Sequence, residues 1–448
     1  MIDDLSIIIL AAGKGTRMKS SLPKVMHSVA LRPMLYLVID QALQLSPKSI
    51  TIVISEQLKS WQQQISADFP AINIDFAIQQ QQLGTADAVK SALPSINKYN
   101  PAKVLILYAD TPLINSKTLK QMLDLQCCIA VLSFQQNLPH QYGRLISNEQ
   151  NQVSQIVEYK DCDDKQLQIT LCNSGVMAIS GNHLEMLLNK INNNNKAQEY
   201  YLTDIISLAN SFNLTCLHLP VNKNEVLGVN SKQELAFIDN IKQQQIKQQL
   251  LDGGTTILMP DTVYIAHDAN IEADVIVDPF VFIGKNVVIK AGSHIKSFSH
   301  LEGVVIGNNA TIGPHSRLRP RTIVADDAKI GNFVEVKNSK VGKNSKINHL
   351  SYIGDTTIGN SSNIGAGTIT CNYDGYQKFN TTIGDDVFIG SNSCLIAPLN
   401  IGDNVVVGAG SVITNNIDNG DMAVGRAKQA NIKQGAARYH NRKSKNNV

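Results

Sequence analysis

The chain has 448 residues, a formal net charge of +3 and a hydrophobic fraction of 43%. This length exceeds what one hydrophobic core usually organises, so two or more domains are expected. The near-neutral charge argues against a nucleic-acid-binding surface, and no apolar run is long enough to span a bilayer. The seven cysteines lack metal-site spacing, and the first residues lack a signal-peptide layout. We therefore expect a reduced, cytoplasmic protein that binds neither nucleic acid nor membranes.

The first half of the chain alternates short apolar runs with amphipathic stretches. The alternation predicts a Rossmann-like α/β domain over residues 1–228, with an open and mostly parallel sheet. We expect strands at Ser6–Leu10, Ser49–Ser55, Ile74–Ile78, Val104–Tyr108, Ile129–Phe134, Val176–Ile179 and Leu214–Leu219, and helices at Leu35–Leu45, Ala86–Leu93 and Ser116–Leu125. Ligands of such sheets lie at the carboxyl ends of strands, so polar residues just after each strand are the candidates for a site.

A glycine-rich loop over residues 10–18 follows the first predicted strand. Its backbone can wrap an anion, and Lys14, Arg17 and Lys24 add positive charge. The loop is neither a Walker loop nor a dinucleotide fingerprint, and a plain turn with surface cations is the alternative. Together with Leu22-Pro23-Lys24 it resembles the signature of the sugar-nucleotide pyrophosphorylases. That resemblance implies triphosphate binding by Leu10, Ala11, Ala12, Gly13 and Lys24, with charge neutralisation by Arg17 and Lys24.

Other predicted strand ends carry amide and carboxylate side chains. Gln79 precedes Gly84-Thr85, and an amide can pair with a nucleobase edge. Asp110 follows Tyr108-Ala109, and a carboxylate beside a triphosphate is a suitable Mg²⁺ ligand. A turn cap before Thr111-Pro112 is the alternative role for Asp110.

These residues, together with segments 142–144, 157–158, 173–175, 199–204 and 228–230, resemble the N-acetylglucosamine-1-phosphate uridyltransferases. The resemblance implies that Gln79, Gly84 and Thr85 read uracil and that Asp110 and Asn230 hold Mg²⁺. It also places Tyr108, Ala109, Gly143, Glu158 and Asn173 in the site for the UDP-sugar, the last three on the N-acetylhexosamine. Ala86 and Ala109 stand where the family usually has Gly, which would add a methyl near the nucleotide.

The implied reaction needs no general base. The phosphate of the sugar 1-phosphate is already ionised at neutral pH, and one of its oxygens would attack the α-phosphorus of UTP as pyrophosphate leaves. Positioning and charge neutralisation would supply most of the catalysis.

Residues 229–252 have apolar positions at roughly helical spacing and are followed by Gly253-Gly254. We expect one connecting helix there. From residue 253 onward the period changes to six: a β-branched residue is usually followed by Gly, as in Ile283-Gly284 and Ile353-Gly354. This hexapeptide repeat predicts a parallel β-helix over residues 253–448, tail included, with the aliphatic residue in the core and the Gly at a tight corner. It resembles the left-handed β-helix acyltransferases.

A β-helix can be a scaffold with no chemistry of its own, so its irregular parts matter. The six-residue period is lost across residues 370–380, and a loop leaving a solenoid commonly belongs to its binding face. His349 lies shortly before this loop and could act as a base near neutral pH. Arg319 and Lys337 lie about one coil apart, and two stacked cations form a phosphate site.

Segments 317–320, 332–337, 349–355 and 363–375 resemble the acetyltransferase half of the bifunctional N-acetylglucosamine-1-phosphate uridyltransferases/glucosamine-1-phosphate acetyltransferases. With the first half, the resemblance covers nearly the whole chain in the right order. It implies His349 as the base that deprotonates the attacking amine, amino-sugar phosphate binding by Arg319, Lys337, Tyr352 and Asn363, and acetyl-CoA binding by Ala366, Asn372, Tyr373, Ser391, Ala409 and Arg426. It also implies a homotrimer. Arg321 departs from the family, in which Gly usually follows the proline.

The resemblance thus predicts a two-step enzyme that acetylates glucosamine 1-phosphate with acetyl-CoA and couples the product to UTP, for peptidoglycan and lipopolysaccharide synthesis. Two alternatives are a pyrophosphorylase whose β-helix is only a scaffold and a glucose-1-phosphate adenylyltransferase. Within the acetyl step, covalent catalysis by Cys371 is an alternative to base catalysis by His349.

Overall fold

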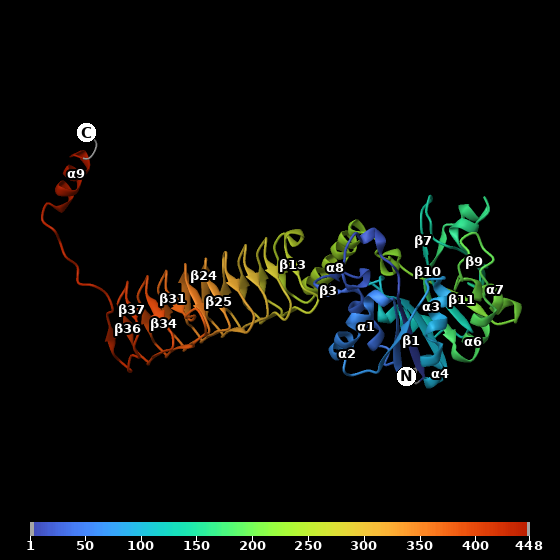
Figure 1. Ribbon diagram of the computed structural model, residues 1–448, viewed down its shortest axis with the longest axis horizontal. Helices are drawn as coiled ribbons and strands as arrows, with labels where there is room; N and C mark the ends of the chain where they lie inside the picture. The colour runs from blue at the N-terminus through green and yellow to red at the C-terminus, as the bar shows by residue number, and fades with distance from the viewer. Residues whose placement is uncertain (1–3, 446–448) are drawn as a thin grey trace. The chain divides into compact units, whose positions relative to one another are not determined.

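The computed structural model describes residues 4–445, and these residues form two compact units. The first unit ends at Gln245 and the second begins at Ile246, within helix α8 (Lys232–Asp252), the helix expected over this stretch. Figure 1 shows that the N-terminal unit is an α/β structure and that the C-terminal unit consists of stacked β-coils. Among the residues described, no helix is both long and apolar enough to cross a membrane.

The first unit contains a mixed sheet with strand order β11-β7-β10-β6-β1-β4-β5. These strands are β1 (Leu5–Ala11), β4 (Ser49–Ile54), β5 (Ile74–Ile78), β6 (Lys103–Tyr108), β7 (Ile129–Gln135), β10 (Leu171–Ser180) and β11 (Cys216–Pro220). Strand β10 is antiparallel to both of its neighbours, and every other pair on this path is parallel. The α/β class and the predicted strands are therefore confirmed.

Helices pack on both faces of this sheet because its central strands are apolar on both sides. In β1, Ile7 and Ile9 enter one core while Ile8 enters the other, and all three side chains are fully buried. The helices are α1 (Met34–Leu43), α2 (Gln62–Asp68), α3 (Thr85–Ser91), α4 (Leu93–Tyr99), α5 (Ser116–Leu123), α6 (Gly181–Lys190) and α7 (Asp204–Ser211). The sequence predicted α1, α3 and α5. It missed the other helices, the β8–β9 hairpin (Arg144–Ser147, Val153–Val157) and the short pair β2–β3 (Ser28–Val29, Arg32–Pro33).

The second unit is a β-helix with three parallel sheets. The first sheet contains β12 (Thr256–Ile257), β15 (Ile276–Val277), β18 (His294–Ile295), β21 (Thr311–Ile312), β24 (Lys329–Asn332), β27 (Lys346–His349), β30 (Asn363–Ile364), β33 (Phe388–Ile389), β36 (Val406–Val407) and β38 (Met422–Ala423). The second contains β13 (Tyr264–Ile265), β16 (Phe282–Ile283), β19 (His300–Leu301), β22 (Arg317–Leu318), β25 (Glu335–Lys337), β28 (Tyr352–Gly354), β31 (Ile369–Cys371), β34 (Cys394–Ile396) and β37 (Val412–Ile413). The third contains β14 (Asn270–Ile271), β17 (Val288–Ile289), β20 (Val304–Ile306), β23 (Thr322–Val324), β26 (Lys340–Val341), β29 (Thr356–Ile358), β32 (Thr381–Ile383) and β35 (Leu399–Ile401). A terminal helix, α9, spans Gly435–Lys445.

The repeat glycines stand where a side chain would be blocked, as predicted, although few of them have the left-handed backbone of a corner residue. Corner residues with left-handed backbone are mostly other types, such as Asn286 at φ 54° and Phe333 at φ 55°. The repeat glycine instead packs against the next coil: a Cβ on Gly331 would lie 1.9 Å from the carbonyl oxygen of Asn348. The preceding aliphatic residue, Ile330, is buried in the core as expected. The glycine in each repeat therefore permits the close stacking of successive coils.

The predicted interruption is a hairpin loop between β31 and β32. Thr356 pairs with Thr381, 25 residues on, whereas Ile306 pairs with Val324, 18 residues on. Tyr373 and Lys378 form an antiparallel bridge across the loop, and Asp374 accepts hydrogen bonds from the backbone of Tyr376 and Gln377.

Candidate active sites

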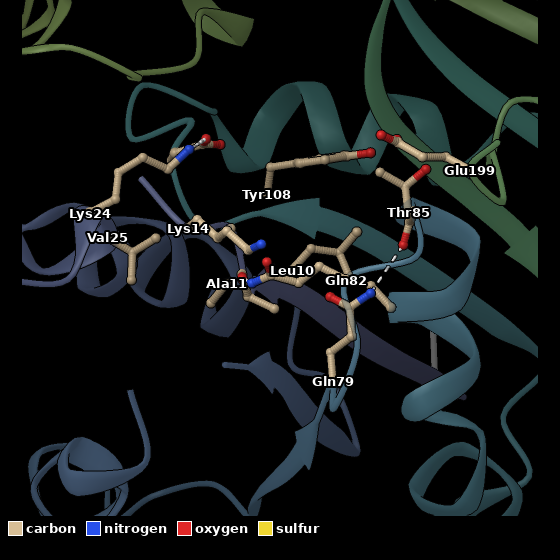
Figure 2. Close-up of a pocket in the computed structure, with 15 residues that line it drawn as sticks. Leu10, Ala11, Lys14, Lys24, Val25, Gln79, Gln82, Thr85, Tyr108 and Glu199 are labelled. Atoms are coloured by element: carbon tan, nitrogen blue, oxygen red, sulfur yellow. Dashed lines mark hydrogen bonds and ion pairs between the residues drawn. The ribbon is translucent and has the colours of Figure 1, made fainter. Parts of the chain in front are cut away.

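A pocket of about 310 Å³ opens at the carboxyl ends of β1, β5 and β6. Figure 2 shows side chains from these strands and from the glycine-rich loop around it. Its walls comprise Leu10, Ala11, Ala12, Gly13, Lys14, Lys24, Val25, Gln79, Gln82, Gly84, Thr85, Ala88, Tyr108, Asp110 and Glu199. Lys14 was expected only to add positive charge to the loop, and the sequence assigned no binding role to Val25, Gln82, Ala88 or Glu199. Glu199 was within a recognised segment, so a signal for it existed.

Arg17 and Ala109, two of the residues that the sequence predicted for this site, do not line the pocket. Arg17 lies in a short 3-10 helix, Thr16–Met18, and its side chain is exposed outside the pocket walls. Ala109 is fully buried with its N–H donated to the carbonyl of Leu10 at 3.0 Å. Ala86 is also fully buried. The methyl groups of both alanines pack in the sheet's cores, and neither lines the pocket.

Lys24 connects the two predicted metal ligands. Its ammonium donates to the Asp110 carboxylate and, at 3.1 Å, to Oδ1 of Asn230. Asp110 follows β6 and Asn230 precedes α8, so the contact joins residues far apart in the sequence. The two oxygens converge on one cationic atom, and carboxylate and amide oxygens are ligands that Mg²⁺ accepts. Among residues 4–445, no cluster of three or more His, Cys, Asp or Glu side chains could hold a metal, so this pair would need ligands from the substrate phosphates.

The segment over residues 83–86, which contributes Gly84 and Thr85 to the pocket, is joined by backbone hydrogen bonds to the loop that contains Tyr200. Tyr200 donates its N–H to Leu83 at 2.8 Å, and Ala86 donates to the carbonyl of Tyr200 at 2.9 Å. Gly84 has φ +129°, and a Cβ there would lie 2.4 Å from the carbonyl oxygen of Tyr200. Only Gly fits this close approach. The hydroxyl of Thr85 accepts from the N–H of Leu202 at 3.0 Å.

The predicted sugar residues lie together beside Tyr108. The N–H of Asn173 donates to the carbonyl of Gly143 at 3.0 Å, and a Cβ on Gly143 would be 3.4 Å from the Glu158 carboxylate. Burial raises the pKa of Tyr108, and the charges of Glu158 and Asp110 add to this shift. Glu158 therefore lies close to Tyr108, which lines the nucleotide pocket.

The Glu158 side chain is itself half-buried. Burial raises the pKa of this carboxyl, opposed by a hydrogen bond from Thr203 at 3.1 Å. Thr203 lies in the family-like segment 199–204, but the sequence assigned it no role of its own. A half-buried carboxylate with one hydroxyl partner keeps acceptor capacity for the hydroxyl or amide groups of a sugar.

In the β-helix, His349 is oriented by the neighbouring coil. Its Nδ1 lies 2.5 Å from Oδ1 of Asn332, the residue that it pairs with between β27 and β24. An amide oxygen only accepts, so Nδ1 carries the proton and Nε2 keeps a lone pair. The imidazole is exposed. Nε2 is therefore the nitrogen that can act as a general base, and the sequence motifs gave Asn332 no role of its own.

The candidate phosphate residues lie at equivalent positions on consecutive coils. Arg319 and Lys337 follow the paired residues Leu318 and Val336. Each has a carboxylate partner: Arg319 contacts Glu335 at 2.9 Å and Lys337 lies 3.7 Å from Asp355. The neighbouring amine of Lys378, followed by desolvation, lowers the pKa of Lys337. Lys378 lies in the hairpin loop and was not among the predicted site residues.

Asp355 gathers several of these groups. It is 6% exposed and accepts hydrogen bonds from Asn338 at 2.5 Å and from Asn372. The cost of burying the carboxylate is outweighed by these bonds and by the charge of Lys337, so its pKa lies below the usual value. Tyr352 is close by, since a Cβ on Gly354 would contact both the Tyr352 hydroxyl and the Asn372 amide. Asn363 pairs with Lys346 on the strand that carries His349.

The remaining acetyl-CoA candidates follow one edge of the β-helix. Asn392 donates its N–H to Ala366 at 2.7 Å, and Gly410 donates to Ser391 at 2.8 Å, so Ala366, Ser391 and Ala409 occupy successive coils. The Arg426 guanidinium donates to the carbonyl of Ala409. Tyr373 is 60% exposed on the hairpin, with its hydroxyl donating to Gly375 at 2.5 Å.

Cys371 is a poor nucleophile in this setting. Burial raises the pKa of its thiol, and the neighbouring Cys394 adds to the shift. The thiolate is the nucleophilic form, so these shifts disfavour the covalent route.

The two units thus have the architecture of a sugar-nucleotide pyrophosphorylase joined to a β-helix acyltransferase. Residues 7–160 match the MobA-like NTP transferase domain, and residues 300–398 match the GMPPB C-terminal domain. A bifunctional protein GlmU from Brucella anthropi is 47% identical over 96% of this chain and 94% of its own. Those of Zymomonas mobilis (98% of this chain, 98% of its own) and Paramagnetospirillum magneticum (97% and 96%) are each 43% identical.

The chain belongs to the GlmU family of bifunctional proteins. The resemblance drawn from the sequence is confirmed, as is the left-handed β-helix class of the second unit. The chain is an enzyme of UDP-N-acetylglucosamine synthesis with uridyltransferase and glucosamine-1-phosphate acetyltransferase activities, which act on nucleotide and acetyl-CoA substrates.

Proposed function

We propose that each unit carries one activity. The domain of residues 1–228 performs uridylyl transfer, the helix over 229–252 connects the units, and the β-helix domain of residues 253–448 performs acetyl transfer. The observation that carries this assignment is the separation of two complete sets of groups. The glycine-rich loop, Lys24 and Gln79 gather at one pocket of the first unit, whereas His349 and Asn332 pair within the second. Acetylation precedes uridylylation in this proposal, in the order that the family resemblance implies.

In uridylyl transfer, the loop over residues 10–13 and Lys24 bind the triphosphate, and Arg17 approaches it from the exposed turn. Gln79, Gly84 and Thr85 hold uracil, while Gly143, Glu158 and Asn173 hold the sugar beside Tyr108 and Ala109. Asp110 and Asn230 would hold Mg²⁺, which supplies charge neutralisation at the phosphates. The convergence of their oxygens on the Lys24 ammonium supports this. Lys24 then has to leave the pair and turn to the phosphates.

In acetyl transfer, His349 removes the proton that makes the glucosamine amine non-nucleophilic. Asn332 keeps the acceptor nitrogen of His349 directed away from the coil. Arg319 and Lys337, joined by Lys378, bind the sugar phosphate with Tyr352 and Asn363 beside them. Acetyl-CoA lies along the edge formed by Ala366, Ser391 and Ala409, with Asn372, Tyr373 and Arg426 around it. Both acetyl-CoA and UTP are cytoplasmic metabolites, so we place the enzyme in the cytoplasm.

We also propose a homotrimer formed through the β-helix. An edge between the first and second β-helix sheets carries exposed apolar side chains on successive coils. Ring centroids are 5.2 Å apart for Phe280 and Phe298, 4.8 Å for Phe298 and His315, and 5.1 Å for His315 and Phe333. Phe280, Phe298 and Phe333 are each more than half exposed. A continuous column of exposed aromatic rings, three of them phenyl groups, supports coverage by another copy of the chain.

The direct test measures pyrophosphate release from UTP and Mg²⁺ with glucosamine 1-phosphate, with and without acetyl-CoA. Release that requires acetyl-CoA supports two working sites in the proposed order. Release independent of acetyl-CoA contradicts that order and favours the scaffold role for the β-helix. Release only from N-acetylglucosamine 1-phosphate would locate the failure in acetyl transfer.

A further inference from the structure

Gln79 presents a fixed donor and acceptor pattern to the nucleotide pocket. The side chain lies just after β5, is 7% exposed and lines the pocket. Its Nε2 donates to the carbonyl of Gly84 at 3.1 Å and to Oδ2 of Asp87 at 2.8 Å. An amide nitrogen has two hydrogens, so both donors are used. In Figure 2 the nitrogen of Gln79 faces the dashed bond and the amide oxygen lies on the opposite side.

Asp87 prevents the Gln79 side-chain amide from flipping by a half-turn. If the Gln79 amide were flipped, its oxygen would face two groups that only accept, the Gly84 carbonyl and the Asp87 carboxylate. A buried acceptor without a donor costs free energy, so the observed orientation is the stable one. The Gly84 carbonyl alone binds one hydrogen, and Asp87 supplies the second contact. Asp87 lies in the first turn of α3, where a negative side chain also interacts favourably with the helix dipole.

We propose that Asp87 is a positioning residue for nucleobase selection. By holding the Gln79 amide nitrogen, it directs the Gln79 oxygen at the base as an acceptor. The uracil N3–H is a donor at the centre of its pairing edge, whereas cytosine has an acceptor there. The arrangement therefore takes a uridine nucleotide and rejects a cytidine nucleotide. This inference rests on the proposed binding of UTP at this pocket.

The test compares kcat/KM for UTP and CTP, measured as pyrophosphate release with N-acetylglucosamine 1-phosphate and Mg²⁺. In Asp87→Asn the new amide can donate to a flipped Gln79, so the UTP-to-CTP ratio should fall about tenfold or more. Asp87→Glu keeps a carboxylate acceptor and should retain more of the ratio. Ser91→Ala is a matched control, because Ser91 bonds the backbone of Asp87 at 3.1 Å without touching Gln79. Its ratio should equal that of the wild type.

A role limited to stabilising α3 gives a different result. Asp87→Asn would then lower turnover of both nucleotides equally and leave the ratio unchanged, which would overturn the inference. Thermal unfolding of each variant identifies loss of folding, and Asp87→Glu supplies the ratio if Asp87→Asn does not fold. A wild-type enzyme that does not turn over UTP would instead contradict the proposed function itself.

Discussion

His349 Nδ1 and Asn332 Oδ1 lie 2.5 Å apart on adjacent coils of the β-helix. This contact leaves the other imidazole nitrogen as the proton acceptor. We expect His349→Ala to lose acetyl transfer by about 10²- to 10⁴-fold, the usual contribution of a general base. Uridylyl transfer from N-acetylglucosamine 1-phosphate should be retained, because its pocket lies in the other unit. Parallel assays of both reactions check this, and an equal loss in both would contradict the assignment.

Asn332 should act through His349 only. Asn332→Ala removes the acceptor that fixes the tautomer, and we expect kcat for acetyl transfer to fall about tenfold, the value of one hydrogen bond. The KM for acetyl-CoA should stay unchanged. Asn332→Asp keeps an acceptor and should preserve activity while raising the pKa in the kcat profile, because a carboxylate stabilises the imidazolium. An unchanged pH profile in Asn332→Asp would show that the pair is not used.

The Lys24 bridge predicts competition between an ammonium group and a metal ion. Lys24→Met should lower uridylyl transfer by about 10²- to 10³-fold, since one preorganised charge on the phosphates is lost. In the absence of nucleotide, the same variant should bind Mn²⁺ more tightly, because Asp110 and Asn230 lose their cationic partner. Titration followed by water proton relaxation measures this directly. Lys19→Met, an exposed lysine near the loop, is the control, and weaker Mn²⁺ binding in Lys24→Met would contradict the exchange.

Asp355 should matter for both stability and acetyl transfer. Asp355→Ala leaves Asn338 and Asn372 without their acceptor, so we expect a loss of about 1–3 kcal/mol in unfolding free energy. The KM for glucosamine 1-phosphate should rise, because Lys337 and the hairpin loop lose a shared contact. Asp326→Ala is a matched control: Asp326 accepts from the N–H of Asn308 at 2.7 Å on another coil. It should lower stability without changing KM, and identical KM values for both variants would refute the role of Asp355.

The lowered pKa of Lys337 predicts an alkaline limit to phosphate binding. The neighbouring Lys378 amine, and then desolvation, favour the neutral form of Lys337. As pH rises through this lowered pKa, Lys337 loses its charge earlier than an ordinary lysine, and the KM for glucosamine 1-phosphate should rise. Lys378→Met removes the neighbour, so the rise should begin at higher pH even though KM is larger throughout. Lys329→Met serves as the control, and an onset unmoved by Lys378→Met would contradict the coupling.

The amino-acid sequence by itself determined the architecture, because its signals are local. The apolar run Ile7–Ile9 predicted a strand buried on both faces, and the six-residue repeat predicted the β-helix and its interruption near Tyr373. Short motifs identified the family and most of the pocket walls. These features depend on periodicity and on neighbours within a few residues, which the sequence displays directly.

Only the tertiary structure decided which side chains meet. Lys24 contacts Asn230 across 206 residues, Gln79 is held by Asp87, and Lys378 joins Lys337 from a loop that leaves the coil. The structure also placed the methyl groups of Ala86 and Ala109 in the cores, away from the nucleotide pocket. Such contacts arise where strand ends and coils are brought together by packing, and no local period encodes them.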